Sequence, residues 1–175
     1  MAAVVGVALL LGGCVGAAIG VGSQLPDKHV MTSPFDARQV AHIHQVGDAN
    51  IEGVMTVPDR YDDKSMVPPA GSQIRVYPDS PYAREWIQAL FGDRKASFDP
   101  IEIDSALESD FKRMARVGRT DKNGRFRIDG IPAGAYFVVG TGYFADAKRL
   151  QKSALVYERV TLTKGQTANV ALDGR

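Results

Sequence analysis

The sequence has very little of the chemistry from which catalytic and metal sites are built. It contains one cysteine, Cys14, so no disulfide can form within the chain and no thiolate cluster can hold a metal. Its three histidines all precede Asn50, and the motifs of serine hydrolases, zinc peptidases and phosphate-binding loops do not occur. A formal net charge of +1 gives no general attraction to nucleic acid. We therefore expect no enzymatic activity, no metal or cofactor, and no nucleic-acid partner.

Charged side chains are absent from the first 22 residues. An apolar run over residues 2–11 leads into Leu11-Gly12-Gly13-Cys14, which resembles the lipobox of bacterial lipoproteins. The resemblance implies a signal peptide over residues 1–13, cleavage before Cys14 and lipidation of that cysteine. The mature protein would be anchored in the bacterial cell envelope and face the periplasm, with the outer membrane favoured over the inner.

The same run has a second interpretation as an uncleaved transmembrane helix. Residues 2–22 are long enough to span about 30 Å of hydrocarbon. Gly12, Gly16 and Gly20 would then share one helix face and permit close packing, as in a small subunit of a larger membrane complex. Six glycines in this run lower its helix propensity, which favours the lipoprotein. Either interpretation attaches the protein to a membrane.

The rest of the chain divides into a linker and one domain. Residues 14–49 show no regular period, and we interpret them as the anchor and a linker. Residues 50–175 alternate apolar and polar side chains between turn signals, which predicts an all-β, antiparallel sandwich of about seven strands. A short helix is predicted over 82–90, in an insertion, with Gly92 ending it. The expected strands include 51–57, 73–77 and 111–119, with 155–162 and 167–172 as a closing pair.

The most specific pattern runs from Thr120 to Tyr136. Asn123-Gly124 is a strong turn signal, and Phe126 and Ile128 then alternate with charged residues as in a half-buried strand. The whole pattern resembles that of carboxypeptidase regulatory-like domains, small β-sandwiches with a prealbumin (transthyretin-like) topology. The resemblance implies a structural or binding role, because the peptidase chemistry of the family's namesakes lies in a separate domain.

Two groups of side chains are candidate ligand contacts. Tyr82 and Trp86, the only tryptophan, could stack against a sugar ring. Basic residues are also dense between 112 and 127, where Arg116, Arg125 and Arg127 could contact lipid phosphates or an acidic polysaccharide. The alternatives are that the aromatic residues lie in the core and that the basic residues pair with the acidic residues just before them.

A metal site has weak support in the sequence. His42 and His44 would place two imidazoles on one side of an extended segment, but a third ligand would have to come from Asp48 or His29. The acidic loop at 59–63 lacks the spacing of a calcium-binding loop. We interpret both as solvated surface groups.

Together these patterns predict a membrane-anchored, extracytoplasmic lipoprotein whose β-sandwich acts as a structural or protein-interaction module. The alternative is a module that binds carbohydrate or lipid headgroups. The sequence does not identify the partner, whether an envelope protein or a glycan.

Overall fold

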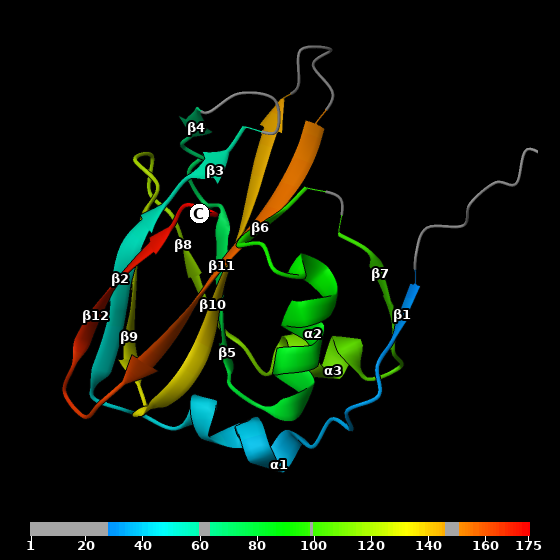
Figure 1. Ribbon diagram of the computed structural model, residues 1–175. Coiled ribbons are helices and arrows are strands. Elements are labelled where there is room, and N and C mark those ends of the chain that lie inside the picture. Colours follow the sequence, from blue (N-terminus) through cyan, green and yellow to red (C-terminus); the bar gives the residue numbers. More distant parts are fainter. Residues whose placement is uncertain (1–27, 60–63, 99, 146–150) are drawn as a thin grey trace, which may run out of the picture.

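The computed structural model describes residues 28–59, 64–98, 100–145 and 151–175 (Figure 1). The predicted signal peptide, Cys14 and the three evenly spaced glycines lie outside these ranges, as does most of the acidic loop. Within the described part of the chain, no helix is both long enough and apolar enough to cross a membrane.

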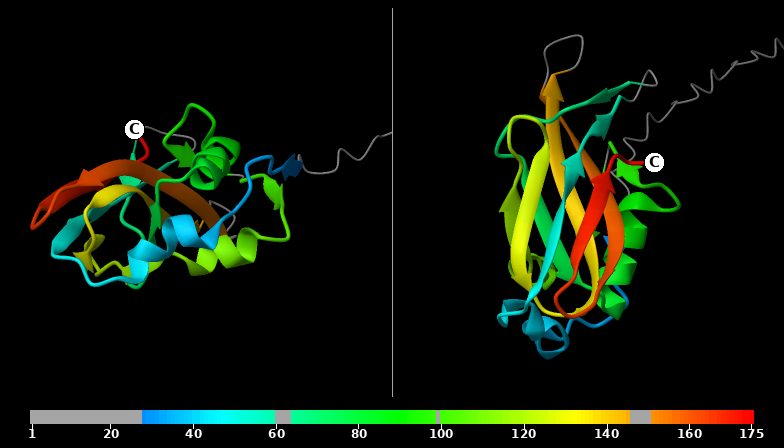
Figure 2. Two further views of the ribbon diagram at one scale, coloured as in Figure 1. Left: turned by 90° about the horizontal axis from the view of Figure 1, so that it is seen from below. Right: turned by 90° about the vertical axis from the view of Figure 1, so that its left-hand side faces the viewer.

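Two β-sheets packed against each other form the body of the protein (Figures 1 and 2). One has five strands in the order β6-β11-β10-β5-β8, and the other has three in the order β12-β2-β9. All neighbouring strands in them are antiparallel except β12 and β2, which are parallel. The strand bounds are β2 Ala49–Met55, β5 Gln73–Pro78, β6 Ala96–Ser97, β8 Arg116–Arg119, β9 Arg125–Ile131, β10 Gly134–Ala145, β11 Gln151–Leu162 and β12 Thr167–Leu172. The predicted β-sandwich is confirmed.

The remaining elements lie around this sandwich. Short pairs are formed by β1 (Lys28–Val30) with β7 (Glu102–Asp104) and by β3 (Val57–Pro58) with β4 (Ser65–Met66). Helices α2 (Pro81–Phe91) and α3 (Glu108–Arg113) lie against the five-stranded sheet, on its side away from the three-stranded sheet (Figure 1). Helix α1 (Ala37–Val40) and the 3-10 turn η1 (Ala41–His44) lie at one end of the sandwich.

Part of the five-stranded sheet is apolar on both faces. Ile74, Val76 and Val138 point into the core between the sheets, as the alternation of a strand requires. Their neighbours Tyr77 and Phe137 point the other way and are equally buried, in a second core under α2 and α3. The helices are therefore needed to keep the second apolar face from water.

Helix α2 confirms the predicted helix and has clear boundary signals. Ser80 caps its first turn, with its hydroxyl accepting a hydrogen bond from the Ala83 amide at 3.1 Å. Pro81 occupies the first turn, where it costs no hydrogen bond, and Gly92 ends the helix with a positive φ of 58°.

Three expectations about local structure are wrong. The segment 111–119 is not one strand, because Phe111 packs into the second core from α3 and only β8 is extended. The expected closing pair does not form: β11 pairs with β10, while β12 crosses to the other sheet and pairs with β2. The linker 14–49 contains, from Lys28 on, elements that belong to the fold, since Val40 and Ile43 are fully buried.

The stretch from Thr120 to Tyr136 carries the chain between the two sheets. The Asp121 carboxylate accepts hydrogen bonds from the amides of Asn123 and Arg125 at 2.8 and 2.9 Å, which closes the turn between β8 and β9. The Tyr136 hydroxyl donates to the carbonyl of Pro132 at 2.8 Å and fixes the turn between β9 and β10. The predicted turns are present, but each joins strands of different sheets instead of forming a hairpin.

Gly124 offers a test of how much this turn contributes to stability. Its φ is +74°, and an added Cβ would lie 2.4 Å from the carbonyl oxygen of Met55. Gly165 has a φ of +71° with nothing within 4 Å of such a Cβ, so it is a matched control. Both alanine variants should lose roughly 1–2 kcal/mol for the left-handed backbone. We expect Gly124→Ala to lose clearly more in denaturant unfolding, and equal losses would contradict the assigned contact.

Candidate ligand-binding hollow

The outer face of the five-stranded sheet carries polar side chains beyond the part that the helices cover. The antiparallel register places Arg75 opposite Val139, and Gln73 opposite Thr141. Thr141 is in turn opposite Leu155 on β11. Directly opposed side chains lie about 5 Å apart, so these residues form continuous rows across three strands.

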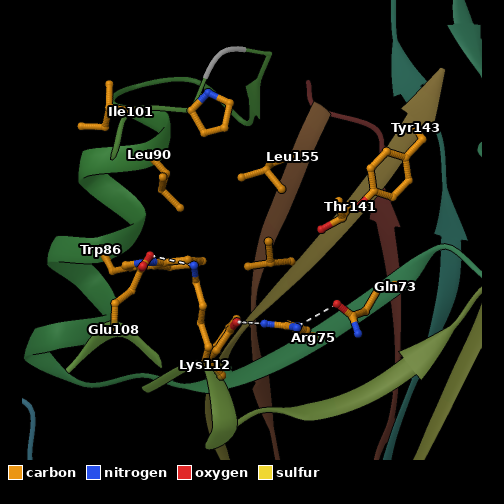
Figure 3. A pocket seen from close by; sticks show the side chains of 13 residues that line it. Gln73, Arg75, Trp86, Leu90, Ile101, Glu108, Lys112, Thr141, Tyr143 and Leu155 are labelled. Atoms are coloured by element: carbon orange, nitrogen blue, oxygen red, sulfur yellow. Dashed lines mark hydrogen bonds and ion pairs between the residues drawn. The ribbon is translucent and has the colours of Figure 1, made fainter. Parts of the chain in front are cut away.

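A hollow of about 380 Å³ lies over these rows, between the sheet and the two helices (Figure 3). Trp86 and Leu90 line it from α2, and Glu108 and Lys112 line it from α3. Figure 3 shows these side chains on one side of the hollow and Thr141, Tyr143 and Gln73 on the other. Pro100, Ile101, Arg75, Tyr77, Val139 and Leu155 complete the lining. The volume is in the range of small-molecule sites.

Hydrogen bonds hold the polar groups of the hollow in place. The Trp86 indole N–H donates to Glu108 Oε1 at 3.1 Å, and Lys112 Nζ lies 2.9 Å from the same oxygen. Arg75 donates through Nε to Gln73 Oε1 at 2.9 Å and through Nη1 to the Tyr77 hydroxyl at 3.4 Å. Burial raises the pKa of the Tyr77 hydroxyl above its ordinary value of 10.0, so this partner of Arg75 stays neutral.

The predicted aromatic contacts are buried. Tyr82 is 2% exposed, packs against Phe111 and donates its hydroxyl to Ser105 at 3.0 Å. Trp86 is 4% exposed, yet it lines the hollow. The two rings therefore form no open stacking surface. Tyr143, at the rim and 44% exposed, is the accessible ring of this site.

The three predicted arginine contacts do not line the hollow. Arg116 donates to the carbonyls of Ile43 and Gln45 at 2.9 and 2.8 Å, which fixes η1 to the sandwich. Arg127 pairs with Glu52 and Asp129, both at 2.7 Å. Arg125 is exposed on β9 of the other sheet. Arg116 and Arg127 are both bonded to Asp129, the first through its carbonyl at 3.3 Å and the second through its carboxylate. The partners of Arg127 are therefore not the acidic residues just before this segment, as the alternative expected.

The histidines do not gather either. His42 and His44 belong to η1, a helical turn and not the extended segment that was expected. His29 Nε2 lies 3.0 Å from Glu85 Oε1. Among the residues that the structure describes, no three potential metal ligands come together.

Glu85 on α2 is a structural site that sequence reasoning missed. Its carboxylate accepts hydrogen bonds from the amides of Ser33 and Thr32 at 2.6 and 2.7 Å, and from the Thr32 hydroxyl at 3.1 Å. With the His29 contact, these bonds tie segment 28–33 to the helix that walls the hollow. Hydrogen bonds from Ser33 and Thr32 outweigh burial and hold the pKa of Glu85 far below its ordinary value of 4.5.

Sequence reasoning also missed most residues of the hollow itself. Alternation along 73–77 places Arg75 on the face opposite Ile74 and Val76, so the orientation of its side chain could be inferred. The position of α2 and α3 over that face could not be inferred, because it depends on contacts between distant segments.

A solved structure similar to this chain has the same kind of β-sandwich fold. No protein-family model matches the chain, and no curated protein matches its sequence. Among solved structures, it is similar to a candidate carbohydrate-binding protein from Pseudomonas aeruginosa, with a TM-score of 0.62 and 23% identity over 81% of this chain and 98% of that one. It is similar at a TM-score of 0.35 to a minor pilin from Streptococcus agalactiae, with 17% identity over 74% of this chain and 45% of that one. The first similarity shows a shared β-sandwich fold.

The hydrogen bonds of Glu85 predict a particular pH dependence of stability. Because folding lowers its pKa, the ionised carboxylate stabilises the fold above its ordinary pKa of 4.5, and this contribution is lost as the pH falls further. Glu85→Gln should lower the melting temperature at neutral pH and flatten its fall between about pH 5 and pH 3. Thermal unfolding monitored by circular dichroism measures both effects.

Glu52→Gln is the control, because Glu52 is half-exposed and makes one surface ion pair, with Arg127. This variant should melt close to the unmodified protein at neutral pH. Equal behaviour of the two variants would contradict the role assigned to Glu85.

Proposed function

We propose that this protein is a non-catalytic carbohydrate-binding module of the bacterial cell envelope, and that its ligand occupies the hollow beside α2 and α3. The observation that carries the proposal is the combination of groups in that hollow. Sugars present hydroxyl groups around an apolar ring face, so they need hydrogen-bonding side chains next to apolar ones. Gln73 and Thr141 provide the first, and Tyr143 and Leu155 provide the second.

Two further points support this class of function. The pattern from Thr120 to Tyr136 resembles carboxypeptidase regulatory-like domains, and we propose membership of that family. The similar protein from Pseudomonas aeruginosa is described as a candidate carbohydrate-binding protein, which favours a glycan over an envelope protein as the partner.

The composition of the hollow favours binding over catalysis. Most glycoside hydrolases use two carboxyl groups. Among the described residues that line the hollow, Glu108 is the single carboxylate, and it is already engaged by Trp86 and Lys112. A binding role needs no second acid.

Thr141→Val tests the site, because it removes one hydroxyl and keeps the shape of the side chain. Trp86 is the only tryptophan and lines the hollow, so its fluorescence should report a bound oligosaccharide directly. We expect envelope glycans to shift this emission and Thr141→Val to weaken binding roughly three- to tenfold. Thr167→Val, on an exposed position of β12, should leave binding unchanged. A panel of neutral and acidic glycans that never shifts the emission would overturn the proposal.

We further propose that lipidation of Cys14 anchors the protein in the membrane, facing the periplasm, with the outer membrane favoured. Several acyl chains on one residue suffice for firm attachment, since each buried CH₂ contributes about 0.8 kcal/mol. In the native host, the protein with its natural sequence should fractionate with membranes, and the Cys14→Ser variant should lose the lipid. Mass spectrometry of the membrane-extracted N-terminus tests this, and an intact Met1 or an unmodified Cys14 would contradict it.

A further inference from the structure

Among the residues that the structure describes, one cation in the hollow has no counter-ion, and from it we infer that the preferred ligand is an acidic saccharide whose carboxylate binds Arg75. The inference rests on the proposed function of the hollow as a saccharide site. It adds the chemical class of the saccharide and the residue that selects it.

Arg75 is half-buried on the sheet side of the hollow, and both of its partners are neutral. Within the described residues, no carboxylate pairs with it. A guanidinium removed from water without a counter-ion costs free energy, and charged groups in such places are ordinarily paired. An anionic ligand would supply the missing partner.

The second cation of the hollow differs in this respect. Lys112 Nζ lies 2.9 Å from Glu108 Oε1, so its charge is compensated within the protein. The described residues of the lining therefore include two cations and one carboxylate, and among them the charge without a partner belongs to Arg75. This favours a ligand with one negative charge placed near β5.

The shape of the guanidinium favours a carboxylate. Arginine presents a planar fork of N–H donors that matches two carboxylate oxygens. Hydrogen bonds to Gln73 and Tyr77 use two of its five donors and restrict its orientation, so the others are held in place for a ligand. The apolar residue directly opposite Arg75 is Val139 on β10, which is 4% exposed.

The position of the remaining groups fits a sugar ring attached to that carboxylate. Gln73 lies two residues from Arg75 along β5, and Thr141 on β10 is opposite Gln73. Two residues of a strand span about 6.6 Å, which is comparable to the width of one sugar ring with its carboxyl group. A carboxylate at Arg75 would thus place the ring beside the Thr141 hydroxyl, with Tyr143 at the rim of the hollow.

A pair of ligands that differ only in the acidic group tests the inference. Oligomers of galacturonate and of galactose would be titrated against the complete folded protein, with Trp86 fluorescence and calorimetry as readouts. We expect the acidic oligomer to bind roughly tenfold more tightly or better, because hydrogen bonds to a charged group are the stronger ones. Raising the salt concentration should narrow this difference.

Substitution of Arg75 should remove the preference and keep the site. Arg75→Gln should bind both oligomers with similar affinity, at the level of the neutral one, and Arg75→Lys should retain part of the preference. Arg125→Gln, on the exposed face of β9, is the matched control and should behave as the unmodified protein. Thermal unfolding of each variant checks that the fold is intact. If Arg75→Gln proves unstable, the affinities of Arg75→Lys for the two oligomers test the inference instead.

The outcomes separate this inference from the proposed function. If the protein with its natural sequence binds the two oligomers equally, the role of Arg75 is wrong, but the proposed saccharide site is still supported. Binding of neither would overturn the proposed function itself. If acetate or phosphate competes as strongly as galacturonate, the site is a general anion site and the saccharide class is wrong.

Discussion

The five-stranded sheet has to be shielded from water on both faces, and most of the structure follows from this constraint. Strands β5 and β10 carry apolar side chains on alternate positions toward the three-stranded sheet, and among the positions between them Tyr77 and Phe137 place large aromatic rings on the other face. A sandwich of two sheets satisfies only the first set. Helices α2 and α3 cover the second set, and Phe111 from α3 lies against Tyr77 with ring centroids 4.7 Å apart.

The hollow lies where this cover ends. Along β5, Tyr77 is buried by the helices, while Arg75 and Gln73 follow in the direction away from them. The sequence changes from aromatic to polar at the same point on β10, from Phe137 through Val139 to Thr141. A change in side-chain type that matches the edge of the cover is expected of a surface that is open to solvent or ligand. The site is therefore a consequence of incomplete cover as much as of particular residues.

The sandwich could be predicted from the sequence because its signals are local. The turn at Asn123-Gly124, the alternation of Phe126 and Ile128, and the spacing of Tyr82, Trp86 and Leu90 each depend on neighbouring residues only. The parallel pairing of β12 with β2 could not be predicted in this way, because the sequence of a strand does not determine which other strand it pairs with. Phe111 shows the same limit: its segment was expected to form a strand, but Phe111 lies on α3 and packs against Tyr77 and Trp86.

The hollow is also preformed, which bears on how it would recognise a ligand. Trp86 is held by Glu108 through its N–H and by the rings of Tyr77 and Phe111 at 5.3 and 5.4 Å. Arg75 is held by Gln73 and by the hydroxyl of the same Tyr77. The buried ring of Tyr77 thus helps to orient both Trp86 and Arg75. Because these side chains are already fixed, a ligand would order few groups on binding, and its selectivity would depend on its own shape and charge.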